Sequence, residues 1–436
     1  PAPRAVARGE PGFEALRRAA VWNGRVPDRA PDLVLLPRTE AEVVAAVRMA
    51  RGRGLPIAVR GGGHSWRGAP LRDGGALIDV SGLRGLRIDL RSRTARAGPG
   101  VTGGELVARL APYGLAFPAG HCGEVALSGY LLAGGFGWNA GVWGPACDRV
   151  RAVEAVMPDG RAVRADRERE PDLLWAARGG GPLFPGVVTA FELDLVPAPG
   201  HVARTTHAYD GADAAAVLEH LDAIAPRLAP EVEVTVAIGA RAGRIGVTGT
   251  AFAAEPEAAR RALAPLEEGP AAARERRVAE PSSLPGLHAE MAAVFPPGLR
   301  YAADVAWAEP PLAPTLLDAA GVVARAPSDR SFVMATLAPA TPDRVGRTWG
   351  ALSLAGAAFV ACYAVWEEPA RDAASEAWLR DAVAAVRPAA RGRYVGEADL
   401  LAAPASDCYA PDAWERLAAV REGAGAPGVL HPPLGR

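Results

Sequence analysis

The chain has 436 residues, half of them hydrophobic, with a formal net charge of −1 at pH 7 and no long run of one sign. This length is too great for one compact core and suits two domains. The balanced charge disfavours nucleic acid and anionic membranes as partners.

The cysteines and the start of the chain carry little signal. Cys122, Cys147, Cys362 and Cys408 show no CxxC spacing, so neither a metal site nor a disulfide framework is indicated. We interpret the last three as packing residues. Residues 1–4 contain no apolar signal core, so we expect a cytoplasmic protein, with a processed secretion leader as the alternative.

Capping signals and glycines mark the elements of the first part of the chain. Thr39 to Glu42 forms a capping box for a helix ending near Gly52. Thr102 to Glu105 forms another, for a helix that stops at Gly114. Alternating short elements are expected around them: strands at 55–60, 76–80, 86–90 and 94–97, a hairpin turning at 158–160, a helix over 171–178 and a strand over 187–196.

Two glycine-rich stretches lie among these elements. The first, Arg60-Gly61-Gly62-Gly63-His64-Ser65, follows an expected strand and can present several backbone N–H groups to a phosphate. The second runs from Gly120 to Trp138 and carries no charge from Val125 to Cys147. Because glycine permits close approach and positive φ, this stretch suits backbone lying against a large, partly apolar ligand. No GxGxxG opens a helix within a βαβ unit, which disfavours a nicotinamide site.

Together the two stretches resemble the FAD-linked oxidases of the vanillyl-alcohol oxidase superfamily, in the berberine-bridge-enzyme-like group. The resemblance implies FAD held bicovalently, with His64 on the flavin 8α-methyl and Cys122 on flavin C6. It is specific over 32–197 and generic over 200–355. The other residues that it implies at the cofactor are Arg60, Gly61, Gly62, Gly63, Ser65, Gly120, Val125, Gly129, Gly134, Gly135, Gly137, Trp138, Gly186, Val187 and Val188.

The second half of the chain changes pattern after a linker at 197–200. Strands are expected near 202–209, 231–239, 244–252 and 359–366, and helices near 213–228, 257–267 and 414–421. Residues 281–314 are proline-rich and predicted to be irregular, either as a substrate loop or as a surface connection.

The fold class that follows is α+β. The resemblance implies a PCMH-type FAD-binding domain over 1–197 and an antiparallel-sheet substrate domain over 198–390. A C-terminal segment over 391–436 is expected to return to the FAD-binding domain.

Hydride transfer to a flavin from an alcohol or phenol requires a base near the substrate oxygen. The resemblance makes Tyr394 the first candidate, with Tyr363 and Glu397 next. The alternative for Tyr394 is a structural hydroxyl between domains. His121 is expected only to neighbour the cysteine. Val125 occupies a position where, in the family, a small residue accompanies reaction with dioxygen, which predicts an oxidase. The alternative is that Val125 only packs.

We therefore predict an FAD-dependent oxidoreductase that oxidises a bulky hydroxylated or heterocyclic small molecule, such as a sugar or natural product. Its flavin would be reoxidised by dioxygen. The alternatives are an oxidative cyclase or desaturase of secondary metabolism, and a catalytically silent flavin-binding protein. No nucleic-acid or membrane partner is expected, and the sequence leaves the oligomeric state undetermined.

Overall fold

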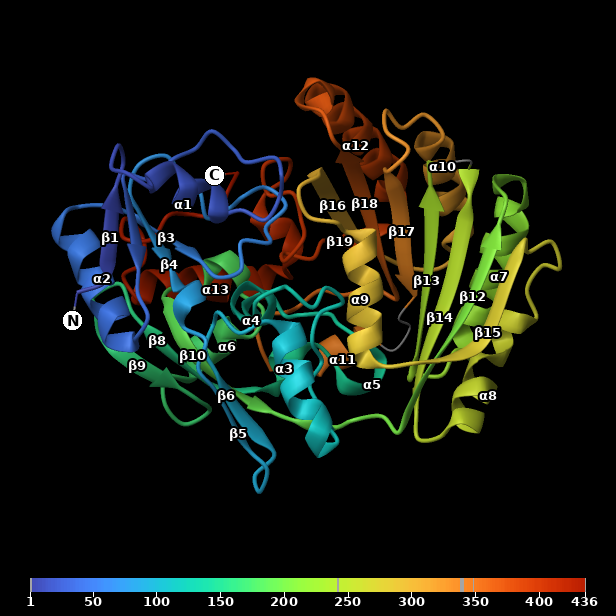
Figure 1. The fold of residues 1–436 in the computed structure, drawn as a ribbon, viewed down its shortest axis with the longest axis horizontal. Coiled ribbons are helices and arrows are strands. Elements are labelled where there is room, and N and C mark those ends of the chain that lie inside the picture. The colour runs from blue at the N-terminus through green and yellow to red at the C-terminus, as the bar shows by residue number, and fades with distance from the viewer. Residues whose placement is uncertain (1, 241–242, 338–340, 348, 436) are drawn as a thin grey trace.

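The computed structural model of the chain describes residues 2–240, 243–337, 341–347 and 349–435. Its first layer is a four-stranded sheet in the order β1-β2-β4-β3. The strands are β1 (Arg4–Ala7), β2 (Leu33–Leu36), β3 (Ile57–Arg60) and β4 (Ala76–Asp79), and α1 (Phe13–Ala19) and α2 (Glu40–Gly52) lie beside them (Figure 1). Strand β4 pairs in parallel with both β2 and β3, so the loop after β3 leaves from the sheet edge.

A five-stranded antiparallel sheet follows, in the order β5-β6-β10-β8-β9. Its strands are β5 (Leu86–Asp89), β6 (Thr94–Ala97), β8 (Val150–Val156), β9 (Ala162–Ala165) and β10 (Val187–Asp194). The helices of this region are α3 (Gly103–Leu110), α4 (Leu127–Leu132), α5 (Ala140–Trp143) and α6 (Pro171–Ala177). A short ribbon joins β7 (Leu115–Ala116) to β11 (Val196–Pro197). Helices and strands thus alternate through this half as the sequence predicts.

The second half builds an eight-stranded antiparallel sheet in the order β15-β12-β14-β13-β17-β18-β16-β19. Its strands are β12 (His201–Tyr209), β13 (Val232–Gly239), β14 (Ile245–Ala253), β15 (Glu275–Ser282), β16 (Arg300–Ala308), β17 (Phe332–Leu337), β18 (Ala358–Trp366) and β19 (Ala390–Gly392). Helices α7 (Ala214–Ile224), α8 (Pro256–Glu267), α10 (Ala313–Val323) and α12 (Asp372–Val386) cover one face (Figure 1). We call this the outer face, and the opposite one the inner face.

Period-two patterning explains why the sheet has two different faces. On β13, Val232, Val234, Val236 and Ile238 are buried among the covering helices, while the residues between them are partly exposed. Successive side chains of a strand point to opposite sides, so these partly exposed positions form the inner face. Helices α9 (Leu284–Val294) and α11 (Thr341–Gly346) lie on this side, toward α3 and α5 (Figure 1).

The predicted helix starts are confirmed. The hydroxyl of Thr39 accepts a hydrogen bond from the N–H of Glu42 at 3.2 Å, and Thr102 does the same for Glu105 at 3.2 Å. The expected closing helix at 414–421 is α13 (Pro411–Gly423), which packs on α6. Beyond α13, the N–H of His431 donates to the carbonyl of Ile57 on β3 at 2.9 Å.

The prediction that 281–314 is irregular is wrong. The segment holds the end of β15, all of α9 and the interior strand β16. Its prolines lie at element ends, where the missing N–H costs little. Pro285 stands in the first turn of α9, and the hydroxyl of the N-cap Ser283 accepts from the N–H of Gly286 at 3.1 Å.

A network of ion pairs joins the start of the chain to the eight-stranded sheet. Arg67 contacts both Glu376 on α12 and Asp399, and Arg25 contacts Glu376 and, at 3.6 Å, Asp372. Burial alone would raise the pKa of Glu376, but its bonds from Arg67 and Arg25 outweigh burial and hold the pKa at about 2. Glu376 is therefore charged at neutral pH, and each of the three carboxylates is matched by an arginine.

Hydropathy does not mark any helix as membrane-spanning. Among the helices of the described residues, none is both long enough and apolar enough to cross a membrane.

Candidate active site

The two glycine-rich stretches lie against each other. A Cβ added to Gly61 would stand 1.7 Å from Oγ of Ser128, and one added to Gly62 would stand 2.9 Å from Cβ of Ala126. Gly63 has a φ of +77°, and a Cβ added to it would stand 2.5 Å from the carbonyl oxygen of Ala20. The loop after β3 therefore packs directly on the residues that begin α4, and side chains at these glycines would push the two stretches apart.

Glycines of the second stretch differ in what they do. A Cβ on Gly137 would lie 2.0 Å from the carbonyl oxygen of Ala119, and Gly134 and Gly135 have φ values of +118° and +78°. A Cβ on Gly129 would meet no atom within 4 Å. Packing therefore requires glycine at 134, 135 and 137 but not at 129.

Helix α9 supports this stretch from the side of the sheet. His288 Nε2 donates to the carbonyl of Gly120 at 3.0 Å. A Cβ on Gly123 would lie 3.0 Å from the ring of His288. The proline-rich segment that contains His288 is thus neither a loose substrate loop nor a surface connection at this point, because it holds the backbone just before Cys122.

Two polar residues predicted at the cofactor brace the first loop. The guanidinium of Arg60 donates to both carboxylate oxygens of Asp79 at 3.2 Å and to the carbonyls of Ala19 and Gly62. The hydroxyl of Ser65 accepts from the N–H of Ala69 at 3.2 Å. Both side chains therefore have protein partners that fix the loop leading to His64.

Three further predicted residues are buried in cores. Val187 and Val188 begin β10, and Val187 packs with residues of the first sheet. A Cβ on Gly186 would lie 3.1 Å from the carbonyl of Val156. Trp138 is buried in a separate cluster with Phe252.

His64 is held as a neutral, oriented ring. It stacks on Trp22 with ring centroids 5.2 Å apart and an interplanar angle of 24°. Burial, helped by the charge of Arg60, lowers the pKa of His64 to about 4. The imidazole is therefore unprotonated at neutral pH and keeps a lone pair available.

Cys122 differs from the other cysteines. It is partly exposed, whereas Cys147, Cys362 and Cys408 are buried, as expected for packing residues. Burial raises the pKa of the Cys122 thiol to about 12, and the charges of Glu397 and Glu124 add to this. Its thiol is therefore protonated at neutral pH and lies within the field of two carboxylates.

Tyr363, which is buried, and Glu397, which is partly buried, form a pair whose carboxylate charge acts on this thiol. The Tyr363 hydroxyl donates to Oε2 of Glu397 at 3.0 Å. Burial raises the pKa of Glu397, while hydrogen bonds from Tyr363 and Trp66 partly oppose it. Aromatic rings enclose the pair: Tyr363 lies 5.0 Å from Phe332 and 5.1 Å from Phe295, centroid to centroid.

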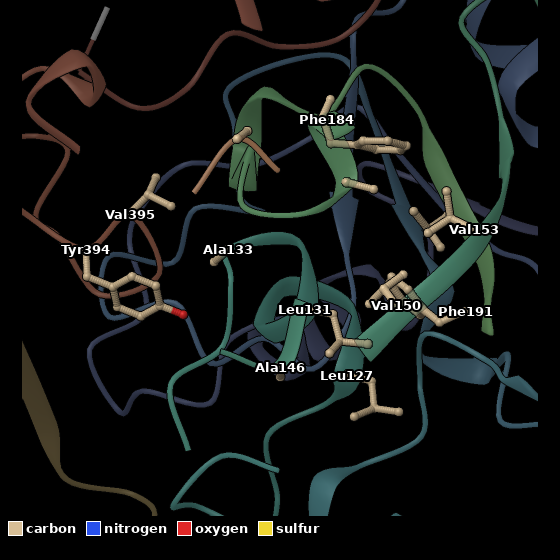
Figure 2. Close-up of a cluster of buried hydrophobic side chains, with 14 of the residues drawn as sticks. Leu127, Leu131, Ala133, Ala146, Val150, Val153, Phe184, Phe191, Tyr394 and Val395 are labelled. Carbon is tan, nitrogen blue, oxygen red and sulfur yellow. The ribbon is translucent and has the colours of Figure 1, made fainter. Parts of the chain in front are cut away.

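Tyr394 occupies a different position. Its hydroxyl accepts a hydrogen bond from the N–H of Gly135 at 3.0 Å, and its ring lies 5.1 Å from Phe136. Figure 2 shows it at the side of the core around α4, with the hydroxyl pointing toward the chain after Ala133. Burial raises the pKa of Tyr394, although the Gly135 N–H lowers it in part. Tyr394 thus ties the C-terminal segment to the glycine stretch.

His121 has a role that the sequence interpretation missed. Its Nε2 lies 2.8 Å from Oε1 of Glu233 on β13, and its ring lies 4.3 Å from Trp138. Burial alone would lower the pKa of His121, but Glu233, and more weakly Glu397, raise it overall. Glu233 is 112 residues away, and no local pattern around it announces the pair.

Comparison with known proteins agrees with this arrangement. Residues 31–166 match the model of the FAD binding domain. The chain is 29% identical to the FAD-linked oxidoreductase nodO of Hypoxylon pulicicidum over 406 residues, which are 92% of this chain and 90% of that protein. The 6-hydroxy-D-nicotine oxidase structure from Arthrobacter nicotinovorans superposes with a TM-score of 0.87 at 26% identity, covering 98% of this chain and 96% of that one.

The fold also matches that of berberine bridge enzyme from Eschscholzia californica, with a TM-score of 0.85 at 20% identity over 99% of this chain and 96% of that one. The resemblance inferred from the glycine stretches is therefore confirmed, and so is the α+β fold class with its antiparallel sheet. The chain therefore carries an FAD binding domain, is similar over most of its length to FAD-linked oxidoreductases, and has the fold of the berberine-bridge-enzyme-like proteins.

Proposed function

We propose that this oxidoreductase holds its FAD by two covalent bonds, through His64 and Cys122. The observation that carries the proposal is that His64 is neutral and held against Trp22, while Cys122 is the one cysteine of four that is partly exposed. An unprotonated imidazole and an accessible thiol, on two stretches packed together, suit attachment to one isoalloxazine ring.

Acid precipitation of the purified protein tests this attachment. A yellow pellet, and one flavin-bearing peptide pair containing both residues, are expected. His64→Ala and Cys122→Ala should each keep flavin on the other residue, and the double variant should release all colour into the supernatant. Colour that leaves the wild-type protein on precipitation would refute the covalent link while leaving FAD binding intact.

We further propose Glu397 as the catalytic base. When bound, the flavin supplies an acceptor for a hydride from the substrate carbon. The proton of the substrate hydroxyl then goes to Glu397, whose pKa is raised by burial. The Tyr363 hydroxyl donates to this carboxylate and fixes its orientation. Tyr394, the first candidate from sequence, is proposed to be structural, because its hydroxyl is engaged by Gly135.

Dioxygen is the proposed electron acceptor. Val125 is partly exposed, and its N–H donates to the carbonyl of Cys122 at 3.2 Å, so its side chain belongs to the same turn as the thiol. Relatives named as oxidases, including (R)-6-hydroxynicotine oxidase and a xylooligosaccharide oxidase, support the proposal that dioxygen accepts the electrons. Anaerobic reduction followed by mixing with aerated buffer tests it. Rapid reoxidation with hydrogen peroxide release is expected, and reoxidation only by a quinone or dye would refute it.

The proposed substrate is a bulky hydroxylated or heterocyclic small molecule. Aromatic rings around Tyr363 and Glu397 give the reacting region an apolar wall. The structural relatives include an enzyme named for 6-hydroxy-D-nicotine and one in complex with xylobiose. Bleaching of the bound flavin by members of a panel of aromatic alcohols, heterocyclic amines and sugars is the measurement that identifies the class.

A further inference from the structure

The loop that carries Cys122 is held on its two sides by different parts of the chain. On the side after Cys122, N–H groups at the start of α3 donate to it. The N–H of Gly104 bonds the carbonyl of Gly123 at 2.7 Å, and the N–H of Gly103 bonds the carbonyl of Val125 at 2.9 Å. The chain after Cys122 is therefore fixed by a helix that precedes the eight-stranded sheet in the sequence.

The chain before Cys122 is held from the other half. Nε2 of His288, on α9, donates to the carbonyl of Gly120 at 3.0 Å, and Nε2 of His121 lies 2.8 Å from Oε1 of Glu233 on β13. Among the residues that the structure describes, these are the hydrogen bonds of Gly120 and His121. We call these two bonds the clamp. The approach to the thiol is thus positioned by the eight-stranded sheet and its inner helix.

The clamp restrains a segment that is loose by composition. Gly120 and Gly123 flank His121 and Cys122, and glycine loses more conformational freedom on ordering than any other residue. The ring of His288 also closes on Gly123, where an added Cβ would lie 3.0 Å from it. Without these contacts, the Cys122 side chain would sample many positions.

The two bonds of the clamp differ in strength. Burial alone would lower the pKa of His121, but the charge and hydrogen bond of Glu233 raise it overall, so this bond is charge-assisted. Burial lowers the pKa of His288, and its bond to the carbonyl of Gly120 joins neutral groups. The first bond should therefore restrain the loop more than the second.

The loop of His64 does not share this dependence. Arg60 braces it through Asp79 and the carbonyl of Ala19, and the imidazole stacks on Trp22. In the described part of the chain, no hydrogen bond from beyond residue 80 reaches residues 60–65. One proposed attachment point is therefore positioned within a single part of the chain, while the other is suspended between two parts.

We propose that His121 and His288 are positioning residues for the bond between Cys122 and the flavin, and that this bond, unlike the one to His64, forms only when the eight-stranded sheet has docked. The thioether joins Sγ to flavin C6 and releases the thiol proton and the C6 proton together with two electrons. The flavin takes up these electrons, and dioxygen, the proposed acceptor, removes them as hydrogen peroxide. The clamp increases the fraction of time that the thiol spends at the ring. The inference rests on the proposed double attachment.

Two truncating substitutions test the clamp in the full-length protein. Cells making each variant are sampled at intervals after induction, and the acid-precipitated protein is digested and analysed by mass spectrometry for flavin on the peptides of His64 and Cys122. The measured quantity is the rate at which His64-linked chains gain the second bond, so unfolded chains are not counted. Glu233→Ala removes a charge-assisted bond and should slow this step about 10- to 100-fold. His288→Ala removes a neutral one and should slow it about 2- to 12-fold.

Conservative and neighbouring substitutions separate positioning from general damage. Glu233→Gln keeps an acceptor for His121, and His288→Gln keeps a donor for Gly120, so each should form the second bond faster than the matching alanine variant. Glu231→Ala, two residues before Glu233 and on the same side of the strand, is the control. Within the described residues Glu231 makes no side-chain hydrogen bond, so this variant should keep the wild-type rate.

Three results would overturn the inference: wild-type rates in both alanine variants, a His64 bond that slows as much as the Cys122 bond, or alanine and glutamine variants that behave alike. Each of these leaves the wild-type protein doubly linked. Failure of the proposed function looks different, because the wild-type protein would then carry no flavin on Cys122 at any time.

Discussion

Replacing Glu397 with glutamine separates a catalytic carboxylate from a structural one. Glutamine keeps the size of the side chain and an oxygen that can still accept the hydrogen bond from the Tyr363 hydroxyl, which is 3.0 Å long in the wild-type protein. It removes only the negative charge and the ability to take a proton. The packing around Tyr363 and residue 397 is therefore preserved, and a change in rate reports on proton transfer.

The expected loss of rate in Glu397→Gln follows from the proposed role of Glu397 as general base. General-base catalysis contributes about 10²- to 10⁴-fold, which corresponds to about 2.7 to 5.4 kcal/mol at 1.36 kcal/mol for each factor of ten. Tyr394→Phe, by contrast, leaves the buried N–H of Gly135 without its acceptor, and is expected to lower the free energy of unfolding by about 1 to 3 kcal/mol. One variant should lose rate, and the other should lose stability.

Stopped-flow measurement of anaerobic flavin reduction, repeated across pH, is the assay. A base works as its carboxylate, so the wild-type rate should fall as pH drops through the pKa of Glu397. Because burial raises that pKa, the fall should begin at a higher pH than for an ordinary carboxyl group. Glu397→Gln should lack this limb. Reduction at the wild-type rate by Glu397→Gln, with slow reduction by Tyr394→Phe, would show that our choice of base is wrong.

Three other outcomes are expected. Gly137→Ala, which must displace the carbonyl of Ala119 from 2.0 Å, should lower the free energy of unfolding by about 1 to 3 kcal/mol in thermal unfolding and reduce the flavin content of the purified protein. Gly129→Ala lies in α4 and meets no atom within 4 Å, so it should lower neither. Val125→Leu should slow reoxidation by dioxygen in rapid mixing without slowing flavin reduction. The added methylene would narrow the path of dioxygen to the flavin, because close-packed interiors leave little free space. Arg67→Leu should cost about 3 to 5 kcal/mol in denaturant unfolding; the wild-type contribution of Glu376 is complete above its ordinary pKa and is lost as pH falls toward about 2.

Sequence reasoning succeeded where neighbours in the chain decide the outcome. Thr39 and Thr102 each start a helix through a bond to a residue three positions on, so the helix starts could be predicted locally. The glycine stretches were sufficient to identify the family, because tight packing of backbone on backbone restricts both stretches to particular residues. Their mutual contact, with Gly61 against Ser128, required the structure.

The same reasoning failed where position matters more than composition. The prolines of 281–314 suggested irregular chain, but they stand at or beyond the ends of β15, α9, β16 and α10, where proline is tolerated. Both Tyr363 and Glu397 were named from the sequence, yet only the fold pairs them across 34 residues. The contact of His121 with Glu233 depends on β13 facing the glycine stretch, which no local pattern encodes.

The bond between His431 and Ile57 has a consequence for biosynthesis. Strand β3 leads straight into the loop that ends at His64, and its outer edge is completed by residues 429–431. The two partners are 374 positions apart (431 − 57). At a synthesis rate of about 5 to 20 residues per second, the strand waits about 20 to 75 s for its neighbour. This edge pairing forms only after residue 431 has left the ribosome, so a chain cut off before residue 429 has a cofactor loop without this lateral support.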